Sequence, residues 1–337
     1  MKRLLHPIAL RGNEVSAMAR SKNVLKFLVM LAFLVLTFEF ALAQDLGWPR
    51  TIEHHSGALT LKSKPVRIVS TAPSLTGILL AINAPLVASA ATTPSPLTDE
   101  KGFFSQWARV ADERGVEVLY SNLEFDIEAI IAAEPDLAVV SATGADSVLP
   151  QYAELVAQGI PTMVVNYSNQ SWQDIAKQLG KAAGLEDDVV ASVARFDDYA
   201  AKAAAEIKVP VDPVTIVGYN IGNSYSIGKQ TSAQAQLLEA LGFKVAGLPD
   251  ALTKQVTRSS DFDFISHENL SAAVTGKSVF LLRGLDGDVR SFLSDPVLAN
   301  LDAVKGSRVY SLGPTSFRID YYSGIQMIDM VVPHFRK

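Results

Sequence analysis

The segment EDDVVASVARFDDYAAKAAAEIK, residues 186–208, decides the fold that this sequence predicts. It is rich in alanine, which has the highest helix propensity, and its acidic first residues complement the dipole of a helix N-terminus. The pair Val209-Pro210 follows it, and proline cannot continue a helix. We therefore predict one uninterrupted helix, about 35 Å long at roughly 1.5 Å per residue.

Short β-branched runs alternate with helix-like segments on both sides of this helix, as is typical of βα units with parallel strands. The runs lie at 66–70, 136–140, 161–166, 214–219, 278–283 and 308–312, and the helix-like segments at 75–83, 148–158, 171–184 and 232–242.

The fold class that follows is α/β, with two lobes of mostly parallel sheets joined by one long helix. The first lobe covers residues 44–185, the connecting helix 186–208 and the second lobe 209–337. Because one helix is stiffer than a pair of flexible strands, the cleft between the lobes should be largely preformed. Periodicity alone leaves open that 186–208 is an ordinary helix of one lobe.

The first 43 residues have the pattern of a secretory signal peptide. Basic residues precede the apolar run FLVMLAFLVLTF (27–38), and ALA at 41–43 has the small-x-small pattern of a cleavage site. Cleavage there starts the mature chain near Gln44, and Met18 gives the basic segment a more usual length than Met1 does. The alternative is an uncleaved membrane anchor, which needs about 20 apolar residues.

Composition narrows the location and the partners. The chain contains no cysteine, which excludes disulfides, thiolate metal sites and a lipid-modified N-terminal cysteine. An exported protein without such an anchor stays with the cell when a second membrane confines it, so we predict the periplasm of a Gram-negative cell. The 35 acidic and 30 basic residues, without a long basic run, argue against a nucleic-acid partner.

Two matching segments indicate that the lobes are pseudo-symmetric. In FDIEAIIAAEPDLAVV (125–140) and ISHENLSAAVTGKSVFLL (265–282), a glutamate opens a short helix and a buried strand follows about ten residues later. Glu128 and Glu268 then occupy equivalent places. An acidic residue in a first turn can simply complement the helix dipole, which stabilises the helix by about 0.3–1 kcal/mol. The alternative is a matched pair of carboxylates that docks on a two-fold partner.

Several longer stretches resemble a known family. They are WPRTIEHHSGALTLKSKPVRIVST (48–71), VSATGADS (140–147), VNYSNQSW (165–172) and FRIDYYSGIQMID (317–329). Together they are similar to the helix-linked class of periplasmic binding proteins, which deliver iron chelates and cobalamin to ABC transporters, and above all to its members that carry ferric enterobactin. The resemblance implies the same two-lobed fold, and it implies that Glu128 and Glu268 meet the two-fold permease in the inner membrane.

The resemblance also implies a site for a ferric catecholate siderophore, a bulky aromatic complex with three negative charges. Arginine suits such a ligand because its planar guanidinium can hydrogen-bond the catecholate oxygens and stack on their rings. Arg318 lies within the strongest match, and Arg258 lies in a poorly matching loop near a basic pair of the family. A basic position that the family has around 95–97 is absent here. Either another cation makes up the charge or the ligand differs; the candidates are Arg283, Lys101 and Lys229.

Aromatic residues are further candidates for stacking or hydrogen bonding to the ligand. Trp107, Tyr120 and Tyr225 could serve in this way, although each could also be an ordinary core or surface residue. Tyr321 and Tyr322 are adjacent, so on a helix they point about 100° apart and at most one faces the cleft. We expect Arg318 to reach the ligand and the tyrosines to position the helix start beside it.

Other chemistry finds little support in the sequence. No nucleophile lies in a G-x-S-x-G elbow, no glycine-rich phosphate loop follows a strand, and the five histidines are scattered. We therefore predict a monomeric carrier without catalytic residues, without a cofactor and without metal ligands of its own, in which iron is bound only through the siderophore. The alternatives are a carrier of another iron chelate, such as a hydroxamate siderophore or haem, and a periplasmic siderophore hydrolase.

Overall fold

The structure is a computed structural model that describes residues 47–259 and 261–337. The predicted signal peptide, with its start at Met18 and its cleavage site before Gln44, lies outside the described residues. Within the described ranges, no helix combines the length and the apolar character needed to cross a membrane.

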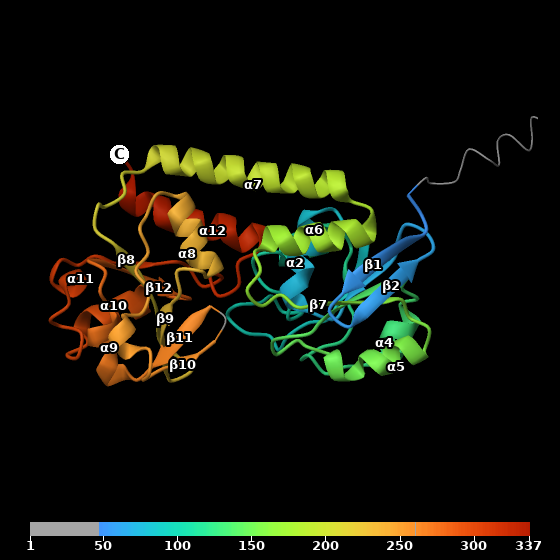
Figure 1. Ribbon diagram of the computed structural model, residues 1–337, viewed down its shortest axis with the longest axis horizontal. Coiled ribbons are helices and arrows are strands. Elements are labelled where there is room, and N and C mark those ends of the chain that lie inside the picture. Colours follow the sequence, from blue (N-terminus) through green and yellow to red (C-terminus); the bar gives the residue numbers. More distant parts are fainter. Residues whose placement is uncertain (1–46, 260) are drawn as a thin grey trace, which may run out of the picture. The chain divides into compact units, whose positions relative to one another are not determined.

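The first half of the chain forms a parallel sheet of five strands in the order β5-β4-β3-β6-β7 (Figure 1). The strands β3, β6 and β7 are buried along their whole length because other elements cover both faces, which explains why they read as continuous apolar runs. A separate hairpin, β1 (Arg50–His54) and β2 (Gly57–Leu61), precedes the sheet. The other elements of this half are β3 (Ile68–Ser70), α2 (Pro73–Ala81), β4 (Leu86–Ser89), α3 (Ala108–Glu113), β5 (Glu117–Val118), α4 (Ile127–Ala132), β6 (Leu137–Ser141), α5 (Tyr152–Ala157), β7 (Thr162–Val165) and α6 (Trp172–Ala183).

The second half forms a sheet of six strands in the order β10-β11-β9-β8-β12-β13. Its pairs β8–β12 and β12–β13 are parallel, whereas β8–β9, β9–β11 and β10–β11 are antiparallel. The reversal begins at a two-residue turn, Gly222-Asn223, in which both residues have φ near +60° as a type I′ hairpin requires. The elements are β8 (Val214–Ile221), β9 (Ser224–Gly228), α8 (Ala233–Ala240), β10 (Thr257–Arg258), β11 (Phe262–Ile265), α9 (His267–Ala273), β12 (Ser278–Leu282), α10 (Asp286–Ser294), α11 (Asp302–Lys305), β13 (Val309–Ser311) and α12 (Tyr321–Phe335).

The predicted connecting helix is α7, which runs from Glu186 to Glu206 and follows the first sheet and precedes the second along the chain; Figure 1 shows it along the top of the view. Three acidic residues occupy its first turn, and it ends at Ile207, whose backbone is extended. Its buried side chains face α6 of the first half and α8 and α12 of the second. The two-lobed α/β fold with one long helix between the lobes is confirmed.

The structure adds a second helix to this connection. The start of α12 packs on α2 of the first lobe, and its end packs on the second lobe, where the ring of Phe335 lies 4.9 Å from that of Phe243. Between these ends α12 lies beside α7, with Tyr199 hydrogen-bonded to Asp329. The two helices run in the same direction, because residues of increasing number pair in order along both.

Candidate ligand-binding site

Arg318 lies in the loop between β13 and α12, and hydrogen bonds fix the backbone of this loop on both sides. The buried amide Nε2 of Gln234 donates to the carbonyl oxygens of Ser316 at 2.8 Å and Phe317 at 3.0 Å. The hydroxyl of Ser323 donates to the carbonyl of Arg318 itself at 2.6 Å. Downstream, the carboxylate of Asp320 caps α12, and burial raises the pKa of this carboxyl group. The arginine is therefore presented from a fixed backbone.

The guanidinium of Arg318 stacks on an aromatic ring from the other lobe. Its Cζ atom lies 4.0 Å from the ring centroid of Tyr167, which follows β7. The arginine is half-buried and its Nε is buried without a hydrogen-bond partner. Among the residues that the structure describes, none forms an ion pair with it within 4.0 Å. Its positive charge is thus available to an anion.

A hydrogen bond to a buried carboxylate holds the side chain of Tyr167 in place. Its hydroxyl donates to Asp146 at 2.8 Å, and the same carboxylate accepts a second hydrogen bond, at 3.0 Å, from the backbone N–H of Ser74 in the first turn of α2. Burial and the neighbouring Asp146 raise the pKa of Tyr167 to about 12, so the phenol stays protonated at neutral pH. The tyrosine therefore remains a hydrogen-bond donor under physiological conditions.

These residues line a small pocket that both halves of the chain build. Residues before α7 form one wall and residues after α7 form the other. The lining residues are Ser74, Ile78, Tyr167, Gln170, Ile175, Ala233, Gln234, Asp261, Phe317, Arg318 and Ile319.

Arg283 reaches the same loop from the end of β12. Its backbone is left-handed, with φ of 53°, and its N–H donates to the hydroxyl of Ser316 at 3.0 Å. Its Cζ lies 5.5 Å from the ring centroid of Phe317, the neighbour of Arg318. The structure thus brings Arg283 and Arg318, two of the predicted cations, to one loop.

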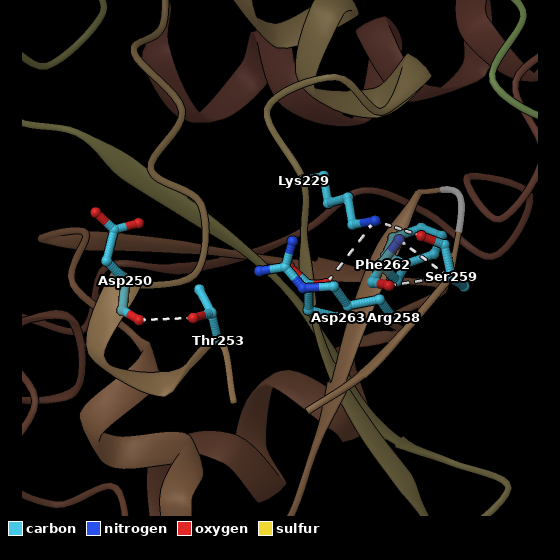
Figure 2. A network of polar contacts seen from close by, with 7 residues as sticks. All are labelled: Lys229, Asp250, Thr253, Arg258, Ser259, Phe262 and Asp263. Carbon is cyan, nitrogen blue, oxygen red and sulfur yellow. Dashed lines mark hydrogen bonds and ion pairs between the residues drawn. The ribbon is translucent and has the colours of Figure 1, made fainter. Parts of the chain in front are cut away.

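Arg258 and Lys229 form a second group of cations, shown in Figure 2. Both approach Oδ1 of Asp263, with N···O distances of 3.7 Å for Arg258 and 3.8 Å for Lys229, and this carboxylate is buried. Lys229 also donates to the carbonyl oxygen of Ser259. The backbone N–H of Lys229 donates to the carbonyl of Asp261, which places the group next to the pocket of Arg318. Two cations share one carboxylate here, so one positive charge is left over.

The remaining predicted residues lie elsewhere. Trp107 is completely buried against Phe103 and Phe104, with ring centroids 5.2 and 6.0 Å away, so no part of it is open to a ligand in this structure. Tyr120 is also buried, donates to the carbonyl of Thr71 at 3.3 Å and has a pKa that burial raises. We assign both to the core, because apolar neighbours enclose their rings.

Tyr225 and Lys101 are likewise engaged by neighbours. The ring of Tyr225 stacks on His267 at 4.7 Å, and Nε2 of His267 donates to the carboxylate of Asp295 at 2.5 Å. Lys101 pairs with Asp112 on α3. The structure therefore does not bring Tyr225 or Lys101 to the loop of Arg318.

The two adjacent tyrosines at the start of α12 pack where the helices of the two lobes meet. Tyr321 lies edge-on to Trp172 at 5.7 Å and tilted against Phe196 at 6.0 Å. Tyr322 packs on Tyr321 at 5.2 Å, and burial raises its pKa to about 12. Their surroundings agree with a role in positioning the start of α12.

Glu128 and Glu268 occupy equivalent places in α4 and α9, each at the second residue of its helix, and both are exposed. Asp126 caps α4 by accepting from the backbone N–H of Ala129 at 3.0 Å. The pKa of Glu268 lies below its usual range because its own backbone N–H and the Ser266 hydroxyl donate to the carboxylate. Neither glutamate has an ion-pair partner within 4.0 Å among the described residues.

Sequence reasoning missed Tyr167, Asp146 and Gln234 as parts of this site. A signal for the first two was present, because both follow buried parallel strands, β6 and β7, and ligand crevices form at the carboxyl ends of such strands. Gln234 carried no signal, because a glutamine in the first turn of a helix looks like a solvent-exposed residue.

Comparison with known proteins places the chain in a family. Residues 68–315 match the periplasmic binding protein family. The chain belongs to that family. It is 43% identical, over 86% of its length and 92% of the relative's, to the ferric enterobactin-binding periplasmic protein FepB of Escherichia coli O6:H1 (strain CFT073). It is also 28% identical, over 57% of its length and 59% of the relative's, to the iron(3+)-hydroxamate-binding protein FhuD of Bacillus subtilis (strain 168).

Solved structures agree with this membership of the periplasmic binding proteins. The crystal structure of holo-ViuP superposes with a TM-score of 0.77 at 37% identity, covering 86% of this chain and 96% of that one. The periplasmic catecholate-siderophore binding protein VctP from Vibrio cholerae superposes with a TM-score of 0.58 at 19% identity, over 84% and 98% of the two chains, and shows the shared fold.

Proposed function

We propose that this periplasmic binding protein captures a ferric catecholate siderophore, ferric enterobactin or a close analogue, and delivers it to an ABC permease. The observation that carries the proposal is Arg318, a half-buried cation without a carboxylate partner that stacks on Tyr167 in a pocket built by both lobes. The 43% identity to a ferric enterobactin-binding protein over most of both chains supports the choice of ligand.

Charge supports a trianionic ligand. The cations in and beside the pocket are Arg318, Arg283, Arg258 and Lys229. The nearby carboxylates are Asp263, Asp261 and Asp146. The cations therefore outnumber the carboxylates. Arginine predominates among them, and its planar group can hydrogen-bond catecholate oxygens and stack on catechol rings at once.

In this proposal the iron keeps its six catecholate oxygens as ligands, and the protein contacts only the outside of the complex. The chain needs no cofactor and acts without covalent chemistry. Its relatives are binding proteins, which supports a carrier over an enzyme. A siderophore hydrolase is the contrasting possibility, and turnover of the siderophore ester on incubation would reveal it.

The proposed place of action is the periplasm of a Gram-negative cell, reached through a signal peptide at residues 1–43. The proposed partner is a permease dimer in the inner membrane, and the carrier works as a monomer. Glu128 and Glu268 support docking on a permease dimer, because both are exposed and stand at matching helix positions. Neither has an ion-pair partner among the described residues. Matched carboxylates suit a partner with two-fold symmetry.

A second candidate ligand is a ferric hydroxamate, because one relative at 28% identity binds iron(3+)-hydroxamate. A neutral ferric hydroxamate would gain less from unpaired arginines than a trianionic complex does, since the attraction between charges needs an anion. The catecholate is therefore favoured.

The test is a fluorescence titration of purified residues 44–337, reported by Trp48, Trp107 and Trp172. Ferric enterobactin, a ferric hydroxamate and haem are added in parallel. We expect saturable quenching by the catecholate alone. Binding of another chelate without a response to the catecholate would overturn the choice of ligand and leave the carrier role in place.

A further inference from the structure

We propose that Tyr167 is a spacer that keeps Arg318 from pairing with Asp146, and so keeps the arginine charge available to an anionic ligand. The inference rests on the proposed function, because it explains how the site stays ready for a ferric catecholate. It assigns Tyr167 and Asp146 as positioning residues that act through Arg318.

The carboxylate of Asp146 is buried and hydrogen-bonded, without a cation beside it in the described part of the chain. Asp146 is 6% exposed and accepts from the N–H of Ser74 and from the hydroxyl of Tyr167. No cation lies within 4.0 Å of it among the described residues. Two neutral donors, one of them at the N-terminus of α2, therefore stabilise this charge without an ion pair.

The side chain of Tyr167 touches both Asp146 and Arg318. It contacts these two charged groups with its hydroxyl 2.8 Å from Asp146 and its ring centroid 4.0 Å from Cζ of Arg318. A guanidinium that could reach a buried carboxylate would form a bidentate pair with it. In the structure the guanidinium lies over the π face of Tyr167 instead, and the Tyr167 hydroxyl occupies one oxygen of the carboxylate. An aromatic face attracts the cation without neutralising its charge.

The backbone at Gly144 leaves the space that the Tyr167 hydroxyl occupies. Gly144 has φ of +85°, and a Cβ atom built on it would lie 1.6 Å from the Tyr167 hydroxyl oxygen. Only glycine fits this position, both for its backbone conformation and for its space. The loop after β6 thus supplies the carboxylate and the room for the phenol together.

The arrangement also crosses the lobes. Tyr167 and Asp146 precede α7, whereas Arg318 follows it, so the first lobe determines how an arginine of the second lobe is presented. A ligand with no negative charge does not depend on this device. Selectivity between an anionic and a neutral chelate is therefore the property that Tyr167 controls.

The experiment compares four variants by titration with ferric enterobactin and with ferrichrome, a neutral ferric hydroxamate. Tyr167→Ala removes the spacer, and we expect the affinity for ferric enterobactin to fall at least about 30-fold as Arg318 pairs with Asp146. Tyr167→Ala combined with Asp146→Asn removes the competing carboxylate as well, and should recover at least about fivefold of that loss. Tyr167→Phe keeps the ring and should lose less than Tyr167→Ala. Tyr152→Ala, a tyrosine on α5 that packs against His54, is the matched control and should bind as the parent does.

If Tyr167 only stabilised the fold, the double variant would bind ferric enterobactin more weakly than Tyr167→Ala, because each of the two buried substitutions would destabilise the protein. The spacer is refuted if the double variant binds ferric enterobactin no better than Tyr167→Ala, with both folded by circular dichroism. If Tyr167→Ala does not fold, Tyr167→Leu fills the core and carries the same comparison. Failure of the parent protein to bind ferric enterobactin at all would instead refute the proposed ligand, so the two failures are distinguishable.

Discussion

Arg318 and the pair Arg258–Lys229 lie near one another and differ in their partners. Arg318 faces an aromatic ring and has no carboxylate within 4.0 Å in the described part of the chain, whereas Arg258 and Lys229 share the buried carboxylate of Asp263. A count of basic residues treats all three alike. Their capacity to bind an anion differs, because a cation already paired with a carboxylate gains less from a second anion. The state of pairing, and not the number of cations, identifies the centre of the site.

The largest effect should come from Arg318→Ala. It removes the unpaired charge and its stacking surface, so we expect affinity for ferric enterobactin to fall about 100-fold, the loss of about one or two charge-assisted hydrogen bonds. The measurement is the fluorescence titration described above. Arg318→Lys keeps the charge but not the planar group, and should fall between the parent and Arg318→Ala. A loss of affinity no greater than that of Arg258→Ala would contradict the difference drawn here between the unpaired and the paired arginine.

The converse change is Asp263→Asn, which turns the paired cations into unpaired ones. We expect affinity for ferric enterobactin to rise about fivefold, because Arg258 and Lys229 lose the carboxylate that they share. The slope of affinity against salt concentration should become steeper as well, since exposed charges are screened. Asp212→Asn, which breaks an exposed ion pair with Lys277 instead, is the control and should leave the affinity unchanged. An unchanged affinity would show that pairing does not limit these two cations.

Arg258→Ala should have a smaller effect than either of these changes. Its side chain is 53% exposed and its charge is partly neutralised by Asp263, so we expect about a threefold loss of affinity. Isothermal titration of the variant beside Arg318→Ala gives the ratio directly. A loss as large as that of Arg318→Ala would mean that the ligand draws Arg258 away from its carboxylate.

The smallest effect should come from Tyr322→Phe. This ring packs against Tyr321, and its hydroxyl is uncharged at neutral pH like that of any tyrosine; burial raises its pKa further, to about 12. Removing the hydroxyl leaves the packing intact, so affinity should change less than about twofold. A loss comparable to that of Arg318→Ala would assign the hydroxyl a direct contact with the ligand.

The elements that sequence reasoning found are those with strong local signals. The alanine-rich segment before Val209-Pro210 predicted α7, and the continuous apolar runs predicted the buried strands. The antiparallel part of the second sheet was missed, although Gly222-Asn223 between two β runs is a hairpin signal. Its short strands did not stand out among the parallel ones.

The site was only partly predictable. Family resemblance pointed to Arg318, and Arg283 was one of three candidates to replace a basic position that the family has and this chain lacks. Neither prediction included the ring that Arg318 stacks on. Contacts such as that between Tyr167 and Arg318 join residues 151 positions apart, and no local pattern encodes them. Burial also depends on contacts that a short sequence pattern does not show. Trp107 is a residue type that can stack on a ligand, but Phe103 and Phe104 pack around it and place it in the core.

The pairing of α7 with α12 has a mechanical consequence. A single rod between two bodies resists bending but lets them rotate about its axis. Two rods in contact also resist this torsion, since rotation would slide one past the other and break the hydrogen bond between Tyr199 and Asp329. The connection therefore resists torsion between the lobes more than a single helix would. Arg318 and Tyr167 come from opposite sides of this connection, so bending changes the spacing of their planar groups, while the resistance to torsion limits how far one group can turn against the other.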